Sequence, residues 1–153
     1  MHLAPAEPSD IPQLTALEDQ SFSSDRISPR QFRYLLTKAN SIVVKAVDHE
    51  TVTGYMVLLK RKTSSKLRLY SIGVAPSSRK KGIARALLTY AEKIATNYHC
   101  KQLTLEVCEH NTSAVQLYLD TGFNQYGLKK NYYEDGCTAL LWKKNLSCED
   151  TTL

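Results

Sequence analysis

A basic turn at the start of a long helix is the first place in this sequence where chemistry can be expected. An apolar stretch at 69–74 predicts a strand, and the apolar spacing from Gly82 to Tyr98 is that of one helix face. Free N–H groups and the positive end of the helix dipole meet at such a helix start, and Gly82 and Ala84 add little bulk there. The pattern Arg79-x-x-Gly82-x-Ala84 therefore predicts a diphosphate site, although a surface helix that begins with a basic turn would look the same. The residues concerned are Arg79, Lys80, Lys81, Gly82, Ile83 and Ala84.

Glu106 is a carboxylate on a strand that otherwise has the pattern of a buried one. In the segment QLTLEV, from Gln102 to Val107, apolar residues alternate with Thr104 and Glu106. A buried carboxylate must be paired, reach water or serve a function, whereas on an alternating strand it can simply face solvent. The residues alone leave both interpretations of Glu106 open.

Tyr118 lies twelve residues later, on a short helix that Asn111 would cap and Gly122 would end. Ala114 and Leu117 stand at helical spacing from it, so Tyr118 is either a core residue or a catalytic one. Asn111, as a cap, would keep spare hydrogen-bonding capacity.

Length and composition narrow the class of protein. The chain has 153 residues with a net charge of +5, which predicts one globular domain over 1–153. No apolar run approaches the roughly 20 residues of a membrane helix, and the first residues lack signal-peptide features, so we expect a cytoplasmic protein without a membrane partner. The basic clusters are local, so nucleic acid is not the expected partner. The cysteines show no metal-ligand spacing and are expected to be reduced thiols, namely Cys100, Cys108, Cys137 and Cys148.

The order of the predicted elements indicates an α/β fold with one mixed sheet and helices on both faces. Asp10 with Gln13, and Ser28 with Gln31, resemble capping boxes that start two helices. Gly54 marks a possible bulge in the second strand. Helices are expected at 11–20, 29–38, 82–98 and 111–121, strands at 41–47, 52–60, 67–74, 102–107, 124–128 and 138–143, and a polar, frayed tail from about 145.

Two stretches resemble the GNAT superfamily of acetyl-CoA-dependent N-acetyltransferases. They are YSIGVAPSSRKKGIARALL, residues 70–88, and LTLEVCEHNTSAVQLYLDTGF, residues 103–123. A third, GLKKNYYEDGCTALLW at 127–142, resembles the ribosomal-protein-alanine N-acetyltransferase branch. Cys108 departs from that branch, which often has arginine there, and Cys137-Thr138 replaces residues that are often acidic. The resemblance implies the GNAT fold, in which a mostly antiparallel sheet has a splayed pair of parallel strands that holds acetyl-CoA.

The resemblance also implies how acetyl-CoA would be held. The backbone of Ile72, Gly73 and Val74 would bond the pantetheine arm, and the Val74 N–H would polarise the thioester carbonyl. Asn111 would contact the pantetheine as well. The diphosphate would lie on the segment predicted above to bind an anion, namely Arg79, Lys80, Lys81, Gly82, Ile83 and Ala84.

For the reaction, the resemblance implies that Glu106 removes the amine proton and that Tyr118, beside the sulfur, protonates the leaving thiolate. Phe22, Tyr132 and Tyr133 would border the acceptor groove. No metal is expected. We therefore expect direct transfer to a primary amine, favouring a protein or peptide N-terminus, by a monomer or a homodimer.

Other functions stay open at this point. The nearest is acetylation of a small amine such as a polyamine, an amino acid or an aminoglycoside. Another is a non-catalytic acyl-CoA-binding module, which would have no need of both Glu106 and Tyr118. A nucleic-acid-binding module would need the basic clusters on one face.

Overall fold

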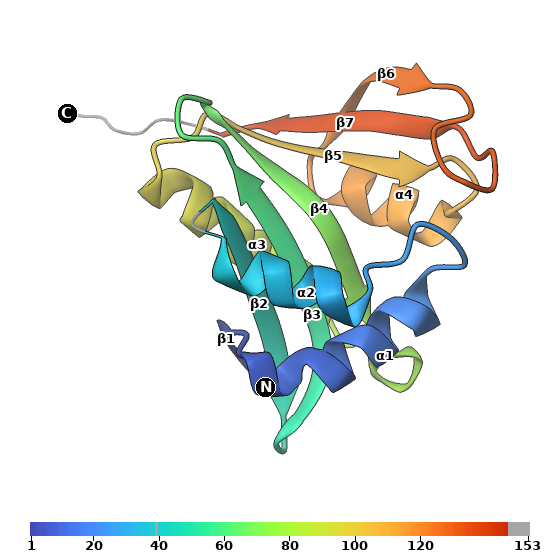
Figure 1. Cartoon of the computed structure of the whole chain (residues 1–153). Coiled ribbons are helices and arrows are strands. Elements are labelled where there is room, and N and C mark those ends of the chain that lie inside the picture. The colour runs from blue at the N-terminus through green and yellow to red at the C-terminus, as the bar shows by residue number, and fades with distance from the viewer. Residues whose placement is uncertain (39, 147–153) are drawn as a thin grey trace.

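The computed structural model describes residues 1–38 and 40–146, whose strands form one seven-stranded sheet in the order β1-β2-β3-β4-β5-β7-β6 (Figure 1). Neighbouring strands are antiparallel except β4 and β5, which run parallel. This confirms the expected mixed, mostly antiparallel sheet of the α/β class. The strands are β1 (His2–Pro5), β2 (Ser41–Asp48), β3 (Thr51–Lys60), β4 (Lys66–Val74), β5 (Gln102–Cys108), β6 (Asn124–Lys129) and β7 (Ala139–Asn145).

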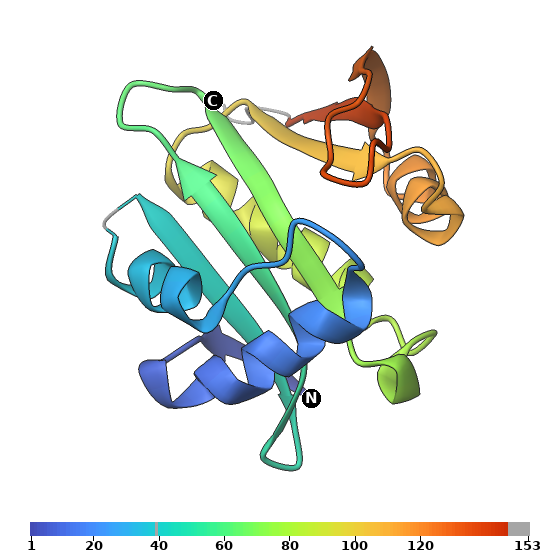
Figure 2. The ribbon, with the colours of Figure 1, turned by 45° about the vertical axis from the view of Figure 1, so that its right-hand side comes forward.

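Helices cover both faces of the sheet, as Figure 2 shows for α1 and α2 in front and α3 behind. Side chains alternate along β3, so Met56 packs toward α3 while Tyr55 and Val57 pack toward α1 and α2. Among the described residues, no helix is long and apolar enough to cross a membrane. The helices are α1 (Ile11–Ser21), α2 (Pro29–Thr37), α3 (Ile83–Asn97) and α4 (Thr112–Asp120), with 3-10 turns η1 (Pro8–Asp10) and η2 (Pro76–Ser78).

Local signals start and end two of the helices as predicted. The Gln31 N–H donates to Ser28 Oγ at 3.1 Å, and the Ser28 N–H donates to Gln31 Oε1 at 2.8 Å, which completes the capping box of α2. Asn111 caps α4 by accepting the Ala114 N–H at 3.3 Å. Gly122, at φ +95°, ends α4 in the left-handed conformation.

The predicted capping box of α1 is wrong. Asp10 instead ends the turn η1, where its carboxylate accepts the Glu7 N–H at 2.7 Å and the Lys45 ammonium at 2.8 Å. Gln13 reaches across to β3, where its side-chain oxygen accepts the Val52 N–H at 2.9 Å. Contacts to β2 and β3, together with the turn at Glu7, therefore take both side chains that the local pattern assigned to a cap.

Several boundaries also differ from the prediction. Strand β1 was not expected, and β7 begins at Ala139 and ends at Asn145. The Leu146 N–H donates to the Lys101 carbonyl at 2.8 Å, so the chain is still held where a frayed tail was expected. The rest of that tail, with Cys148, lies outside the described residues.

Two glycines permit close packing against the sheet. The β2–β3 register shifts between Ala46 and Val47, opposite the Gly54 region, which confirms the expected bulge. A Cβ at Gly54 would lie 2.9 Å from Ile83 Cγ2. A Cβ at Gly73 would lie 2.7 Å from Tyr55 Cε1 and 2.8 Å from Ser21 Oγ. Gly73 therefore lets the end of α1 rest on β4.

A buried polar network joins α1 to the sheet. Glu18 is only 2% exposed, and its carboxylate accepts the Tyr55 hydroxyl, the Ser71 hydroxyl at 3.1 Å and the Ile27 N–H at 2.9 Å. Burial raises the pKa of Glu18, although these hydrogen bonds act in the opposite direction. The network fixes the start and end of the α1–α2 connection, because Glu18 lies before it and Ile27 lies at its end.

Stability should therefore depend on the protonation of Glu18. The folded state holds this proton more tightly than the unfolded chain does, so the contribution of Glu18 to stability is lost as the pH rises above its ordinary value of 4.5 and through the raised pKa. Because Glu18→Gln cannot ionise, we expect its free energy of unfolding to improve, relative to the native chain, as the pH rises. Urea unfolding at several pH values measures this, with Glu50→Gln in the exposed β2–β3 turn as the matched control, because Asp19 itself acts on the pKa of Glu18. A difference between Glu18→Gln and the native chain that stays constant with pH would contradict it.

Candidate active site

A cavity of about 630 Å³ opens where β4 and β5 separate. Their pairing runs from Lys66 with Gln102 to Leu69 with Leu105 and stops there, while β4 stays paired with β3 and β5 with β7. Figures 1 and 2 show the two strands diverging toward α4. The sequence-predicted residues that line this cavity are Phe22, Ile72, Glu106, Asn111, Tyr118, Tyr132 and Tyr133.

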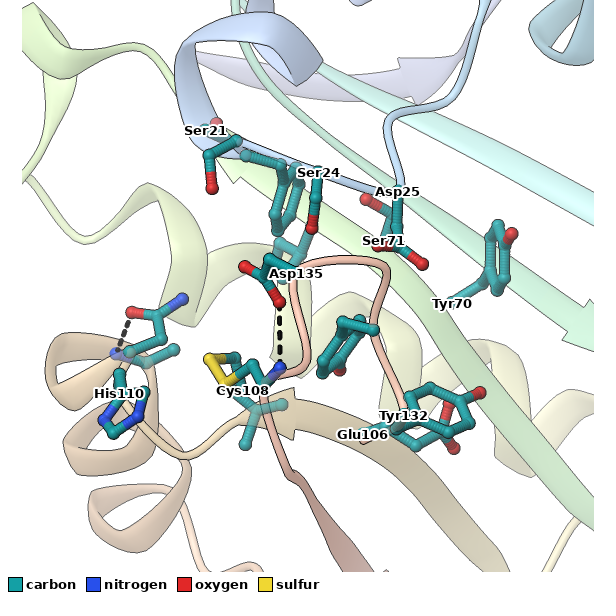
Figure 3. A pocket seen from close by; sticks show the side chains of 18 of the residues that line it. Ser21, Ser24, Asp25, Tyr70, Ser71, Glu106, Cys108, His110, Tyr132 and Asp135 are labelled. Carbon is teal, nitrogen blue, oxygen red and sulfur yellow. Dashed lines mark hydrogen bonds between the residues drawn. A yellow bond between two sulfur atoms is a disulfide. The ribbon is translucent and has the colours of Figure 1, made fainter. Parts of the chain in front are cut away.

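Glu106 faces this cavity with a cation beside it. Its Oε1 accepts Arg68 Nη2 at 2.5 Å, and the Glu106 side chain is 17% exposed. The same Arg68 nitrogen lies 3.5 Å from the Tyr132 hydroxyl, and Figure 3 shows Tyr132 next to Glu106. Burial lowers the pKa of Arg68, but attraction to Glu106 outweighs burial, so its net direction is upward. Of the two interpretations of Glu106, the structure supports the paired carboxylate and not the solvated one.

Tyr118 reaches the cavity from α4 and is buried, at 4% exposure. Burial raises the pKa of its phenol, and the nearby Tyr133 raises it further. The phenol therefore keeps its proton at neutral pH and can donate it. Its ring packs edge-on against Phe123, with centroids 5.5 Å apart, so Tyr118 is a core residue that also borders the cavity.

The start of α3 has the features of an anion site. Gly82 precedes the helix at φ +82°, and no side chain among the described residues caps it, so the first-turn N–H groups stay available. No described atom lies within 4 Å of a Cβ added at Gly82, so a glycine is favoured there by its backbone angle and not by crowding. Arg79 Nε donates to the Val74 carbonyl at 3.2 Å and ties the basic turn to β4. The Ile83 side chain is buried in the core and anchors this helix end.

The same region fits the pantetheine arm of acetyl-CoA. Beyond Leu69, the β4 edge that faces β5 is released from strand pairing, which leaves the backbone groups of Ile72 and the Val74 N–H for an extended ligand, whereas Gly73 pairs with Tyr55 of β3. The other predicted site residues do not line the cavity itself. They lie next to it, along the end of β4 and the start of α3, and are Gly73, Val74 and the segment 79–84. No cluster of metal-ligating side chains occurs within residues 1–38 and 40–146.

Two loops meet across one side of the cavity. The Asp25 N–H donates to Glu134 Oε1 at 3.0 Å, and the Glu134 N–H donates to Asp25 Oδ1 at 2.9 Å. This reciprocal pair joins the α1–α2 loop, which carries Phe22, to the β6–β7 loop, which carries Tyr132 and Tyr133. Both loops line the cavity, and Figure 3 shows Asp25 and Asp135 on facing loops.

A disulfide corrects the expectation of reduced cysteines. Cys108, at the end of β5, is bonded to Cys137 in the β6–β7 loop, with Cα atoms 5.8 Å apart. The prediction relied on sequence spacing, and these residues are separated by 29 positions that reveal no pairing. Cys100 is a buried thiol, as expected. The bond fixes the β6–β7 loop to the strand that carries Glu106.

The residues that sequence reasoning missed act through long-range contacts. Arg68 could have been noticed because it alternates with Leu67 and Leu69 on a half-buried strand. The Asp25–Glu134 pair spans 109 positions and had no signal in the sequence.

The sequence matches the Acetyltransferase (GNAT) family over residues 10–123. The chain belongs to this family. The N-alpha-acetyltransferase RimI of Mycobacterium tuberculosis is 30% identical over 128 residues, which cover 82% of this GNAT chain and 79% of that protein. An uncharacterized protein of Mycobacterium leprae is 29% identical over 141 residues, and this chain spans only 38% of its length.

Solved structures share the GNAT fold. The ribosomal-protein-S18-alanine N-acetyltransferase of Escherichia coli superposes with a TM-score of 0.85 at 22% identity, covering 99% of this chain and 97% of that one. The paia N-acetyltransferase of Thermoplasma acidophilum, in complex with coenzyme A, superposes with a TM-score of 0.82 at 16% identity, covering 94% and 98%. The expected GNAT fold and the resemblance to the ribosomal-protein-alanine branch are thereby confirmed.

The disulfide should be measurable in two ways. We expect the number of titratable thiols in denaturant to rise by two when the protein is reduced. Closing a loop of this size is worth about 3 to 4 kcal/mol in the chain-entropy model, so Cys108→Ser/Cys137→Ser should lose stability of this order. Reductant should lower the unfolding midpoint of the native chain and leave that of the double variant unchanged. Equal thiol counts before and after reduction would contradict the bond.

Proposed function

We propose that this GNAT-family protein transfers an acetyl group from acetyl-CoA directly to the N-terminal α-amine of a protein or peptide. The observation that carries the proposal is that Glu106 and Tyr118, on different elements, line one cavity at the point where β4 and β5 diverge. A base and an acid are thus available beside the edge that suits the cofactor. Direct transfer needs both and needs no covalent enzyme intermediate.

The cofactor would be held by backbone more than by side chains. Acetyl-CoA, when bound, supplies the acetyl group as an activated thioester. Backbone groups of Ile72 and Val74, on either side of Gly73, would align the pantetheine arm, and Asn111 would contact it with the amide nitrogen that its capping bond leaves free. The start of α3 would hold the diphosphate through free N–H groups and the charges of Arg79, Lys80 and Lys81.

Two proton transfers complete the reaction. Glu106, through the oxygen that does not accept from Arg68, would take a proton from the amine directly or through water. Tyr118 would give its proton to the leaving thiolate, which its raised pKa permits because the phenol is protonated at neutral pH. The Val74 N–H would donate to the thioester carbonyl oxygen.

The side of the cavity where the acceptor would bind favours the N-terminus of a peptide as the acceptor amine. Because the Asp25–Glu134 pair bridges the two loops over the cavity, a slender amine is admitted more readily than one on a folded surface. An α-amine has a pKa of about 8, against about 10.4 for lysine, so at neutral pH it needs less help from a base.

Release of free thiol from acetyl-CoA tests the proposal directly. The acceptors would be peptides with free and blocked N-termini, lysine peptides and polyamines. Release with free N-termini that is lost on blocking would support the proposal. Release with small amines alone would replace it by acetylation of a small molecule. Cofactor binding without turnover on any acceptor would favour a binding module.

Tyr118→Phe should lose turnover while affinity for acetyl-CoA changes little. The ring and its packing against Phe123 remain, and only the proton donor is removed. We expect kcat to fall by about 10²-fold or more. Steady-state kinetics and equilibrium binding of CoA check this, with Tyr126→Phe, an exposed residue on β6, as the matched control. Unchanged turnover would remove Tyr118 as the acid.

Glu106→Gln should lower the rate most at low pH. Below a pH of about 8 the acceptor amine is protonated and depends on a base, whereas above it the free amine becomes abundant. The ratio of native to variant kcat/KM should therefore shrink as the pH rises. A ratio that stays flat across a pH–rate profile would argue against the base role.

A further inference from the structure

A second groove, of about 480 Å³, runs beside the candidate active site between α2, the end of β3 and the start of β4. Its charged lining residues are all cationic, and no Asp or Glu occurs among the described residues that line it. Tyr34 and Tyr70 also line it and are exposed large aromatics, at 59% and 44%. The cations are Lys38, Lys60, Arg61, Lys66 and Arg68.

Most of this charge is not neutralised by the protein. Arg68 is paired with Glu106, but within the described part of the chain no carboxylate lies within ion-pair distance of the other four cations. The Lys38 ammonium lies 4.8 Å from the centroid of the Tyr34 ring, and Lys60 bonds to carbonyls of its own turn. The groove therefore presents a positive, partly aromatic surface to whatever enters it.

The groove is continuous with the catalytic cavity. The two share Ile27, Arg68 and Tyr70. Lys66 and Arg68 project from one face of β4, because the intervening Leu67 packs into the core on the α3 side. The groove lies by the start of β4, whereas the proposed diphosphate site follows its end. A peptide that extends from the cavity into this groove would therefore point away from the proposed cofactor site.

The spacing between Lys66 and Glu106 fits a few residues of extended chain. Lys66 lies opposite Gln102 in the sheet, and Glu106 lies four residues farther along β5. At about 3.3 Å per residue this is roughly 13 Å. A peptide whose amine lies at Glu106 would place its second to fifth residues along these cations.

We propose that the groove binds the segment that follows the acetylated residue, and that the acceptors carry acidic side chains at positions two to five. This inference rests on the proposed function and names its substrate class. Carboxylates at those positions would meet the unpaired lysines, and Tyr34 and Tyr70 would contact apolar parts of the same segment. Complementary charge of this kind selects among acceptors that share the same first residue.

Matched peptides test the proposal. Three would begin with the same alanine and continue with four glutamates, four glutamines or four lysines, and kcat/KM would be read from thiol release. We expect the glutamate peptide to be preferred over the glutamine peptide, mainly through KM, and less so as salt increases.

Lys66→Glu should lower kcat/KM for the glutamate peptide roughly tenfold and lower it far less for the glutamine peptide. Lys93→Glu makes the same charge change at an exposed position of α3, on the opposite face of the sheet, and should have no such effect.

The outcomes are distinguishable. Equal acetylation of all three peptides would overturn the groove proposal and leave the proposed function standing. Acetylation of small amines and of no peptide would overturn both. Binding of a single-stranded oligonucleotide that Lys66→Glu abolishes, without discrimination among the peptides, would overturn the acidic peptide in favour of RNA.

Discussion

The site depends on the point where two parallel strands stop sharing hydrogen bonds. β4 and β5 are paired through Leu69 and Leu105, and each then follows its other neighbour. Backbone N–H and C=O groups are obligatory hydrogen-bonding groups, so an edge opened inside a sheet must be satisfied by water or by a ligand. The cavity, the open edge of β4 and the position of Glu106 all follow from this separation.

The separation also explains why side chains from distant parts of the chain are needed to complete the site. The opened space lies between strands and not within one element, so α4, the α1–α2 loop and the β6–β7 loop each supply one wall. The Glu18 network holds the first of these loops at both ends, and Asp25 and Glu134 hold the two loops together. Polar contacts that are individually modest therefore set the shape of the cavity.

The sequence reveals those parts of the structure that are encoded locally. The Ser28 box and the Asn111 cap use neighbours three residues away, and both were predicted correctly. Glu106 was singled out because it is a carboxylate on a strand that otherwise has the pattern of a buried one. The capping box at Asp10 failed because Lys45 and Glu7 compete for the same carboxylate. Arg68 was missed as the partner of Glu106, and the Cys108–Cys137 bond was missed too, since partners from other elements carry no signature in spacing.

The disulfide has a consequence for the β6–β7 loop, which is the proposed acceptor wall, when a ligand binds. Residues between Asn131 and Gly136, both at positive φ, form an irregular turn that would otherwise sample many conformations. Because Cys137 is bonded to the end of β5, this turn loses its conformational entropy when the protein folds. That entropy loss therefore does not oppose ligand binding. The loop is thereby preorganised, and under the proposed function more of the binding free energy would remain for orienting the acceptor amine.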